Sequence, residues 1–455
     1  MAEVSLSQAQ SKPGAEAIVA AAKLGGTVGF VLAETASGKV LEAMNPKAEL
    51  PPASVAKSLT AFYALERLGA QHRFATRVMA TGPVSAGRLQ GDLILVGTGD
   101  PTLDTDGLGA LAANLAARGI TEISGRYLAY GGGFPNLPLI DRDQPDHVGY
   151  NPAISGLNLN FNRVNFEWKR SAKGYELGMD ARGGRFFPRV AMARIKAVDR
   201  DAPLFTFKNG QDLDEWTVSA RALGNGGSRW LPVRHPEFYT AEVFATLMRA
   251  HGLTLPPVKL ITALPAAVTL AERRSEPLGD VMREMLRFST NITAEVIGLT
   301  ASGAGTLRDS AGSMSDWAEA RHSASMRFVD HSGLGGASRI AAAEMVQALR
   351  AARDTAMPNL LREQGVRDEN GQQIKNHPVR IHAKTGTLNF VSGLAGYIRP
   401  PQGPELTFAI FSADTPRRDR LAKQEREQPE GGRQWTRRAR KLQAQLITRW
   451  AGLYT

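Results

Sequence analysis

Three short motifs, each occurring once, constrain the fold of this chain more than any other feature of its sequence. In chain order they are Ser54-Val55-Ala56-Lys57, Ser289-Thr290-Asn291 and Lys384-Thr385-Gly386. Any one of them could arise by chance, because each is a short pattern of common residues in a chain of 455 residues. Three single occurrences in this order are far harder to explain by chance. We therefore expect a fold that brings three distant segments to one site.

The first motif lies at the start of a predicted helix. Prolines precede it, Gly69 closes it, and apolar residues recur between them at helical spacing. A separation of three residues places Lys57 on the same helix face as Ser54, one turn further along. A buried lysine near a second cation, such as Lys384, can lose its proton and activate a serine hydroxyl. The motif therefore predicts a nucleophilic Ser54 with Lys57 as its base, in the positive field of the helix N-terminus.

The second motif falls at a break between two helical runs. A polar tripeptide at such a break can direct its side chains into a cleft. We expect Ser289 to relay protons and Asn291 to hold an amide of the substrate.

The third motif precedes a strand-like segment and is interpreted as an edge strand of a sheet. Lys384 and Thr385 could then bind a carboxylate, while Gly386 would let a substrate backbone approach closely. The backbone N–H groups of Ser54 and Thr387 would form an oxyanion hole.

Each motif also has an ordinary structural interpretation. Taken alone, Ser54 and Lys57 are most often a helix cap and a solvated lysine, and the second motif is most often a pair of helix caps. The third motif alone is most often an exposed strand end with a turn glycine. The three motifs together, in order, favour the catalytic interpretation.

With these motifs the chain resembles the D-Ala-D-Ala carboxypeptidase/endopeptidase family of class C low-molecular-mass penicillin-binding proteins (DacB-like, serine peptidase family S13). The gap from Ser54 to Ser289 is longer than in simple β-lactamases, and this family fills it with an insertion. Three further segments match the family: Leu95–Leu103, Leu157–Asn162 and Asp330–Leu334.

The resemblance implies a role for each motif. Ser54 would be the acylated nucleophile and Lys57 its base, Ser289 and Asn291 would line the cleft, and Lys384 with Thr385 would anchor the terminal carboxylate. No cofactor and no metal are implied. After Asp330–Leu334 the family usually continues with Ser-Arg, where this chain has Gly335-Gly336. We therefore expect a different cleft edge near that loop, a change that bears on substrate preference more than on the chemistry.

The expected fold is α+β, with a penicillin-binding, serine β-lactamase-like catalytic domain in which helices flank an antiparallel sheet. A large strand-rich region interrupts this domain. The expected boundaries are residues 1–69 and 273–455 for the catalytic domain, 70–91 and 166–272 for inserted domain II, and 92–165 for a nested domain III. The expected elements outside the insertion are a helix over Ala15–Lys23, a hairpin of Thr27–Ala33 with Val40–Met44, strands over Ile381–Lys384, Leu388–Ile398 and Leu406–Phe411, and a terminal helix packed on the sheet through Trp435, Ala439, Leu442, Leu446 and Trp450.

The net charge of +11 suggests an anionic partner, and part of the excess lies between Asp414 and Lys441. The ordinary interpretation of that segment is a solvated loop and helix face. The functional alternative is a contact with the cell wall or with anionic lipid. No nucleic-acid-binding motif is present, and the eight histidines show no ligand spacing for a metal. With no cysteine, the chain forms no disulfide.

We therefore expect a serine-type D-Ala-D-Ala carboxypeptidase, also a DD-endopeptidase, which cleaves peptidoglycan stem peptides and is acylated by β-lactams. The alternatives are a β-lactamase, esterase or D-aminopeptidase of the same fold, or a wall-binding protein without turnover. Family members are exported, so we expect a periplasmic or cell-envelope protein whose signal peptide is missing from this form of the chain. Its oligomeric state stays open.

Overall fold

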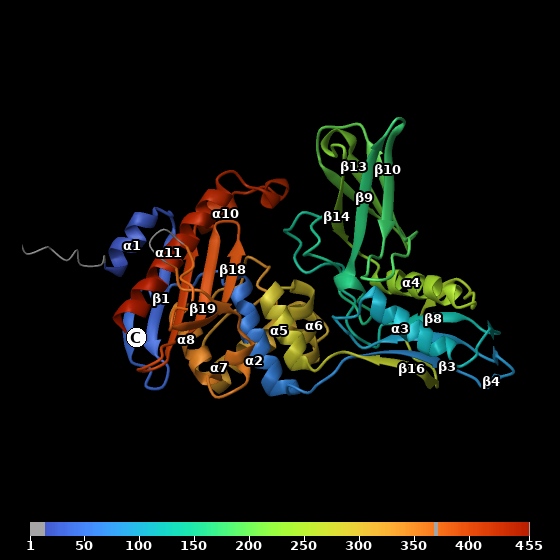
Figure 1. Cartoon of the computed structure of the whole chain (residues 1–455), viewed down its shortest axis with the longest axis horizontal. Helices are drawn as coiled ribbons and strands as arrows, with labels where there is room; N and C mark the ends of the chain where they lie inside the picture. Colours follow the sequence, from blue (N-terminus) through green and yellow to red (C-terminus); the bar gives the residue numbers. More distant parts are fainter. Residues whose placement is uncertain (1–13, 368–371, 455) are drawn as a thin grey trace, which may run out of the picture.

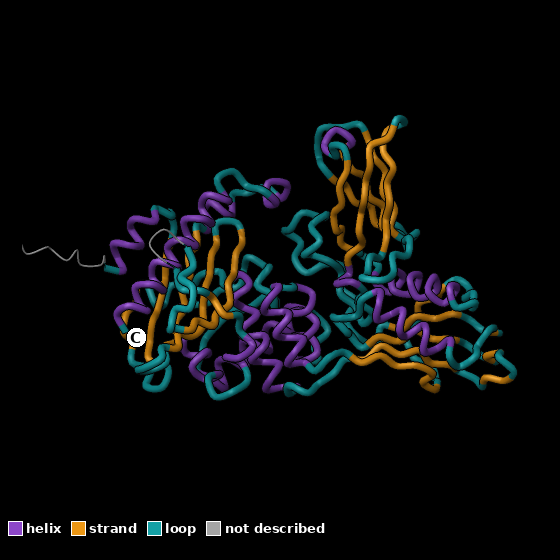
Figure 2. The backbone as a smooth tube through the Cα atoms, viewed as in Figure 1, coloured by secondary structure: helices purple, strands orange, loops and turns teal. Residues whose placement is uncertain are grey.

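The computed structural model describes residues 14–367 and 372–454. Figure 1 shows two regions: the motif region, built from both ends of the chain, and the insertion, built from residues 73–274. Figure 2 shows that the motif region combines a sheet with many helices, while strands dominate the insertion. The class is α+β, as the sequence predicts.

A six-stranded antiparallel sheet in the order β17-β18-β19-β20-β1-β2 forms the centre of the motif region. All eight residues of β20 are buried, because helices cover both faces of the sheet. The predicted hairpin and the three predicted C-terminal strands are all confirmed. The strands are β1 (Thr27–Glu34), β2 (Val40–Met44), β17 (Glu363–Gln364), β18 (Arg380–Leu388), β19 (Val391–Arg399) and β20 (Leu406–Ala413).

Helices α1 (Ala15–Ala22) and α11 (Gly432–Leu453) cover one face of this sheet. The Trp435 indole N–H donates to the Leu24 carbonyl at 2.7 Å, and the Trp450 ring lies 5.8 Å from that of Phe30. The predicted terminal helix is therefore confirmed, and all five residues named for it are buried: Trp435, Ala439, Leu442, Leu446 and Trp450.

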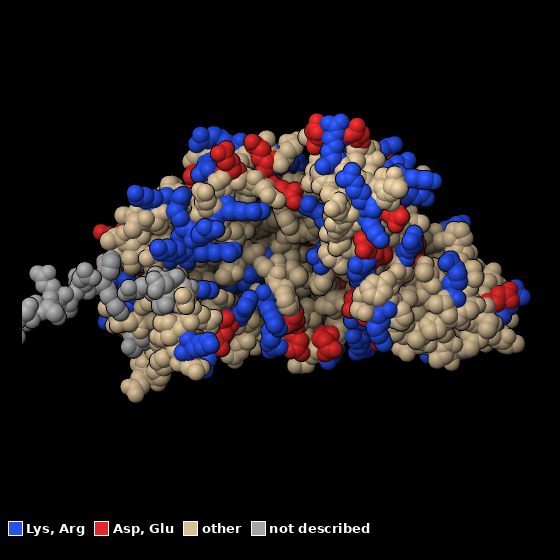
Figure 3. Space-filling model, turned by 45° about the horizontal axis from the view of Figure 1, so that its top comes forward, with Lys and Arg blue, Asp and Glu red and all other residues tan. Residues whose placement is uncertain are grey.

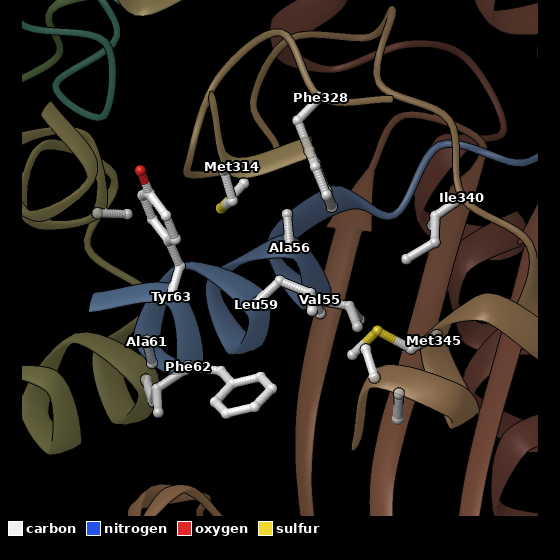
Figure 4. Packing of buried hydrophobic residues seen from close by; sticks show 14 of the residues in the cluster. Val55, Ala56, Leu59, Ala61, Phe62, Tyr63, Met314, Phe328, Ile340 and Met345 are labelled. Carbon is white, nitrogen blue, oxygen red and sulfur yellow. The ribbon is translucent and has the colours of Figure 1, made fainter. Parts of the chain in front are cut away.

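The opposite face carries the helices that position the first two motifs. Figure 4 shows Val55, the last residue of η1, and Leu59 of α2 packed beside Ile340 and Met345 in the core. Burying side chains of this size contributes about 1.5–3 kcal/mol each, so the start of α2 is firmly held. The helical elements here are η1 (Ala53–Val55), α2 (Ala56–Leu68), α5 (Leu278–Phe288), α6 (Asn291–Ser302), α7 (Leu307–His322), α8 (Ala342–Ala352) and α9 (Met357–Leu360).

The part of the insertion nearest the chain crossing is a five-stranded sheet in the order β15-β8-β6-β3-β16. Helices α3 (Thr105–Ala116) and α4 (Pro236–Ala250) pack on it through a core separate from that of the motif region. Its strands are β3 (Ala75–Ala80), β6 (Leu93–Gly97), β8 (Tyr127–Tyr130), β15 (Val258–Leu260) and β16 (Val268–Arg274), with a small sheet of β4 (Val84–Ser85), β5 (Arg88–Leu89) and β7 (Glu122–Ile123) beside it.

Residues 163–232 form a further module that projects from this sheet in Figure 1. It consists of two three-stranded sheets, β10-β9-β14 and β11-β13-β12. Their strands are β9 (Arg163–Ser171), β10 (Gly174–Asp180), β11 (Ala193–Val198), β12 (Phe205–Asn209), β13 (Asp214–Ser219) and β14 (Gly226–Pro232).

The division of the insertion expected from the sequence is wrong in this respect. Strands β6 and β8 fall within residues 92–165, the expected nested domain III, yet β6 pairs with β3 and β8 pairs with β15, which lie outside it. The nested module is instead the span 163–232. The cause is that one sheet draws strands from both ends of the insertion, and glycines and prolines spread throughout the insertion mark no internal boundary.

Two chain segments cross between the regions side by side. The Ser275 N–H donates to the Phe74 carbonyl at 2.9 Å, and the Leu278 N–H donates to the His72 carbonyl at 2.8 Å. The Gly279 N–H donates to the Ala70 carbonyl at 3.0 Å. The exit from α2 and the entry to α5 are therefore hydrogen-bonded to each other.

Candidate active site

Ser54 lies in η1, the single turn that leads into α2, and its side chain is half-buried. The predicted helix therefore begins as a 3₁₀ turn and becomes α-helical at Ala56. The Ser54 hydroxyl oxygen accepts a hydrogen bond of 2.9 Å from the Lys57 ammonium. Ser54 and Lys57 of the first motif are thus hydrogen-bonded to each other at the N-terminal end of a buried helix.

Lys57 is completely buried and makes three hydrogen bonds. Besides Ser54, its Nζ donates to the Asn291 side-chain oxygen at 2.8 Å and to the Ser332 carbonyl at 2.7 Å. Burial, reinforced by the charge of Lys384, lowers the pKa of Lys57 to about 7, although Glu295 and Asp330 act in the opposite direction. A general base is most effective when its pKa lies near the working pH.

Lys384 lies on β18 and is also buried. Its Nζ donates to the Ser289 hydroxyl at 3.0 Å and to the Thr385 carbonyl at 2.8 Å. Burial lowers the pKa of Lys384 to about 8. The fold therefore joins the second and third motifs, as the sequence predicts.

The second motif occupies the junction of α5 and α6. Ser289 has a φ of 60°, a left-handed conformation that is uncommon outside glycine. Asn291 is bonded at both ends of its amide: the oxygen accepts from Lys57, and the nitrogen donates to the Tyr150 carbonyl at 2.9 Å. Binding a substrate amide, the role expected for Asn291, would require the Tyr150 contact to be exchanged.

Gly386 allows a close approach within the protein itself. A Cβ at this position would lie 2.9 Å from the Ser54 backbone nitrogen and 2.7 Å from the Pro52 carbonyl oxygen. The backbone that approaches Gly386 is therefore the protein's own η1 turn, and any larger residue would push β18 away from Ser54.

The outer edge of β18 is only partly covered among residues 14–367 and 372–454. The short strand β17 pairs with Ile381 and His382, before the motif. Thr385 and Thr387 follow on one face of β18 and are both exposed, since alternate residues of a strand share a face. The edge-strand interpretation of the third motif is thus confirmed for the described residues, because β17 covers only the residues before the motif and no described strand pairs with Lys384–Thr387 on that side.

Two buried carboxyls near Lys57 were missed by the sequence reasoning. Glu295 accepts the backbone N–H groups of His331 and Ser332, both at 2.9 Å, and burial raises its pKa to about 8. Burial likewise raises the pKa of Asp330 to about 6. Glu295 follows Asn291 by one turn of α6, and this helical spacing was the available signal.

The Gly335-Gly336 departure lies in the loop that Asp330 organises. Asp330 accepts the backbone N–H of Gly333 at 2.7 Å and also that of Gly335. A Cβ on Gly335 would lie 2.8 Å from an Asp330 carboxylate oxygen, and one on Gly336 would lie 3.2 Å from the Arg418 guanidinium. The two glycines therefore let this loop pack closely at the cleft edge.

A cleft of about 1110 Å³ opens over these residues. Ser54, Ser289, Asn291 and Thr387 line its floor, and many residues between Arg418 and Arg440 form one wall. Figure 3 shows Lys and Arg side chains gathered along one side of the central hollow. Much of the basic segment between Asp414 and Lys441 is thus cleft wall, and a purely solvated face does not describe it.

The opposite wall comes from a long loop of the insertion, which contributes Gln144 and Tyr150 to the cleft. Ion pairs join this side to the basic segment across the cleft. Glu427 pairs with His147 and Arg229, each at 2.6 Å. The other bridging pairs are Lys423 with Asp146 at 2.8 Å and Arg426 with Asp143 at 3.2 Å. We call these contacts, centred on Glu427, the clasp.

A cleft serine bonded to a buried lysine, a second lysine on the adjoining strand, and an antiparallel sheet between helical layers define a penicillin-binding serine hydrolase. Residues 14–437 match the model of the D-Ala-D-Ala carboxypeptidase 3 (S13) family, and the chain belongs to that family. It is therefore a serine-type D-Ala-D-Ala carboxypeptidase.

Individual relatives agree with this family. The D-alanyl-D-alanine carboxypeptidase of Actinomadura sp. (strain R39) is 28% identical over 429 residues, which cover 85% of this chain and 78% of the relative. The D-alanyl-D-alanine carboxypeptidase DacB of Haemophilus influenzae is 24% identical over 414 residues, with 85% of each chain covered. The crystal structure of penicillin binding protein 4 (dacB) from Haemophilus influenzae shares the fold, with a TM-score of 0.72, 20% identity, and coverage of 88% of this chain and 93% of that one.

Among the described residues, no helix has the length and apolar character needed to cross a membrane. No cluster of three or more His, Asp or Glu side chains suited to a metal ion occurs among them.

Proposed function

We propose that this carboxypeptidase acts through an acyl-enzyme on Ser54 and also cleaves the D-Ala cross-links of peptidoglycan as an endopeptidase. One observation carries the assignment of the nucleophile. Lys57 is wholly buried 2.9 Å from the Ser54 hydroxyl, and burial lowers its pKa to about 7. A lysine with an ordinary pKa would keep its proton and could not act as a base, whereas Lys57, with its lowered pKa, can accept the proton of Ser54.

In the acylation step, neutral Lys57 accepts the proton of Ser54 as its oxygen attacks the carbonyl carbon of the penultimate D-Ala. The backbone N–H groups of Ser54 and Thr387 stabilise the negative oxygen of the tetrahedral intermediate. The C–N bond then breaks, and the leaving amine takes a proton from the Lys57–Ser289–Lys384 group of polar atoms. Water attacks the ester, its proton passes to Lys57, and Ser54 leaves with a proton.

Substrate anchoring falls to the exposed part of β18. Lys384 supplies positive charge close to Ser289, and the hydroxyls of Thr385 and Thr387 are free to donate to a terminal carboxylate. In this proposal Lys384 has a second use, because its charge helps to keep Lys57 neutral. One residue would then couple substrate binding to base activation.

The two experiments that test this assignment use the whole chain. Treatment with a penicillin should add one molecule to the protein in intact-mass spectrometry, on the peptide that contains Ser54, and Ser54→Ala should abolish the adduct. An adduct that persists in Ser54→Ala would remove Ser54 from its role. Turnover of a D-Ala-D-Ala peptide should exceed that of ester and cephalosporin substrates; the reverse order would favour an esterase or β-lactamase of the same fold.

Peptidoglycan stem peptides are the proposed substrate, and the cell envelope is the proposed place of action. The relatives that match are carboxypeptidases of bacteria, and one neighbour was solved as a complex with a novel β-lactam. A wall-binding protein without turnover is disfavoured, because such a protein would have no need for a buried lysine bonded to Ser54.

A further inference from the structure

Three arginines of α11 form a row along the cleft. Arg433, Arg437 and Arg440 are spaced by four and three residues, so they share one helix face, and all three are exposed and line the cleft that holds Ser54. The opposite face of α11 is locked into the core by Trp435 and Trp450. The row is therefore held in place by a rigid helix.

Among the described residues, the row lacks the carboxylate partners that the cations of the clasp have. Arg229, Lys423 and Arg426 all pair with acidic residues within 4.0 Å. Within the described part of the chain, no ion pair involves Arg433, Arg437 or Arg440; Arg433 donates only to the Gln428 side chain at 3.2 Å, and Arg440 to the Thr387 hydroxyl at 3.4 Å.

Among the described residues that line the cleft, one is acidic, and it does not neutralise the row. Glu427 is occupied by His147 and Arg229 in the clasp. Like charges one turn apart on a helix are mildly destabilising, so this arrangement gives the fold no stability. A guanidinium, however, binds a carboxylate through two parallel hydrogen bonds, and a cleft concentrates the field of its charges.

The row begins at the reacting centre and leads away from it. Arg440 touches Thr387, which follows the third motif on β18 and flanks the proposed oxyanion hole. Seven residues of α-helix separate Arg440 from Arg433, a rise of about 10 Å. An extended peptide covers that distance in about three residues. A single terminal D-Ala would thus reach only the first arginine.

We propose that Arg433, Arg437 and Arg440 bind the free carboxylates of a stem peptide that lies along α11, so that the enzyme prefers acidic stems over amidated ones. The inference rests on the proposed function, since it places the peptide on the cleft that contains Ser54. Carboxylates are favoured over the phosphates of an anionic wall polymer because the row continues from the site proposed for the terminal carboxylate.

The test compares two cross-linked peptide dimers that both keep the terminal carboxylate free and differ only in whether the other free carboxylates of the stem are amidated. The measured quantity is the ratio of kcat/KM for the acidic dimer to kcat/KM for the amidated dimer. We expect a ratio of about ten in the wild type, a fall of roughly threefold in Arg437→Gln, and a ratio near one in Arg433→Gln/Arg437→Gln, in line with partly exposed ion pairs. Added salt should lower the wild-type ratio.

Arg438→Gln is the matched control, because Arg438 is exposed on the same helix but does not line the cleft. Its ratio should equal that of the wild type. A wild-type ratio near one, or an equal fall in Arg438→Gln, would overturn the inference. Binding of a glycerol-phosphate oligomer that depends on Arg437, with a peptide ratio near one, would also overturn it and would assign the row to phosphate.

Penicillin acylation of Ser54 separates this outcome from failure of the proposed function. If wild-type Ser54 is acylated while the ratio is near one, only the arginine row is misassigned. If Ser54 is not acylated at all, the proposed function itself is wrong.

Discussion

The floor of the active site and the clasp over it hold their charges in opposite ways. On the floor, Lys57 and Glu295 are completely buried, and burial shifts the pKa of each toward its neutral form, to about 7 and about 8. In the clasp, the Glu427 carboxylate keeps partial contact with water, and hydrogen bonds from His147 and Arg229 lower its pKa to about 2.

This difference separates the groups that can transfer protons from the charged pairs that stabilise the contact between the two regions. A buried group can exchange a proton near neutral pH even when it is hydrogen-bonded, because burial disfavours its charged form. A paired group at a surface keeps its charge across the working range and contributes about 1 kcal/mol or less. Substitutions on the floor should therefore reduce activity strongly, and substitutions in the clasp should reduce it little. Variants of Lys57, Lys384 and Glu427 test that contrast.

The largest effect is expected at Lys57. Lys57→Ala should reduce the rate of Ser54 acylation by about 10²- to 10⁴-fold, because it removes the general base. Lys57→Arg should be nearly as damaging, since a guanidinium keeps its proton at working pH. Stopped-flow or mass-spectrometric acylation rates measure the loss, and circular dichroism checks the fold. Near-normal acylation in either variant would place the base elsewhere.

A smaller effect is expected in the pH dependence. Since the pKa of Lys57 is lowered to about 7, acylation should rise with pH up to about 7 and level off above it, where Lys57 is neutral. Lys384→Met removes a nearby positive charge that lowers this pKa, so the rising limb should move to higher pH.

The same variant tests the carboxylate anchor. Wild-type enzyme should hydrolyse a D-Ala-D-Ala peptide faster than its C-terminal amide, and Lys384→Met should erase most of that preference. An unmoved pH limb would disconnect Lys384 from Lys57, while equal wild-type rates on acid and amide would contradict the anchoring role.

The smallest effect is expected in the clasp. The pKa of Glu427 is lowered to about 2, so its stabilising contribution is present above its ordinary value near 4.5 and is lost as the pH falls toward 2. Glu427→Gln should lower the free energy of unfolding by about 1 kcal/mol at pH 6 and by progressively less below pH 4.

Thermal unfolding at a series of pH values measures this change. Glu430→Gln is the control, since Glu430 is exposed in the same segment and takes no part in the clasp. A loss of acylation in Glu427→Gln as large as that in Lys57→Ala would erase the distinction between floor and clasp.

The sequence predicted the local elements and the meeting of the motifs well. The hairpin and the terminal helix follow from hydrophobic periodicity, and the three motifs meet because their chemistry requires one site. The packing of the η1 turn against Gly386 could not be predicted, because only the folded chain shows that this turn lies there.

The clasp and the nested module could not be predicted from the sequence for a related reason. Nothing near Glu427 in the chain indicates that His147 or Arg229, hundreds of residues away, will reach it. Likewise, β3 and β16 lie at the two ends of the insertion yet pair within one sheet, so no local change in composition marks the module between them. Pairings this distant depend on the whole packed structure.

The two hydrogen-bonded crossing segments place the start and the end of the insertion next to each other. Because the Ala70 carbonyl and the Gly279 N–H are only 3.0 Å apart, excising the intervening chain would leave two ends that one short turn could close. The motif region would nevertheless lose Ile140 and Ile154 from its own core and the Tyr150 carbonyl that holds Asn291. The insertion is thus joined to the motif region at a single crossing, yet it supplies part of the core and one wall of the active-site cleft.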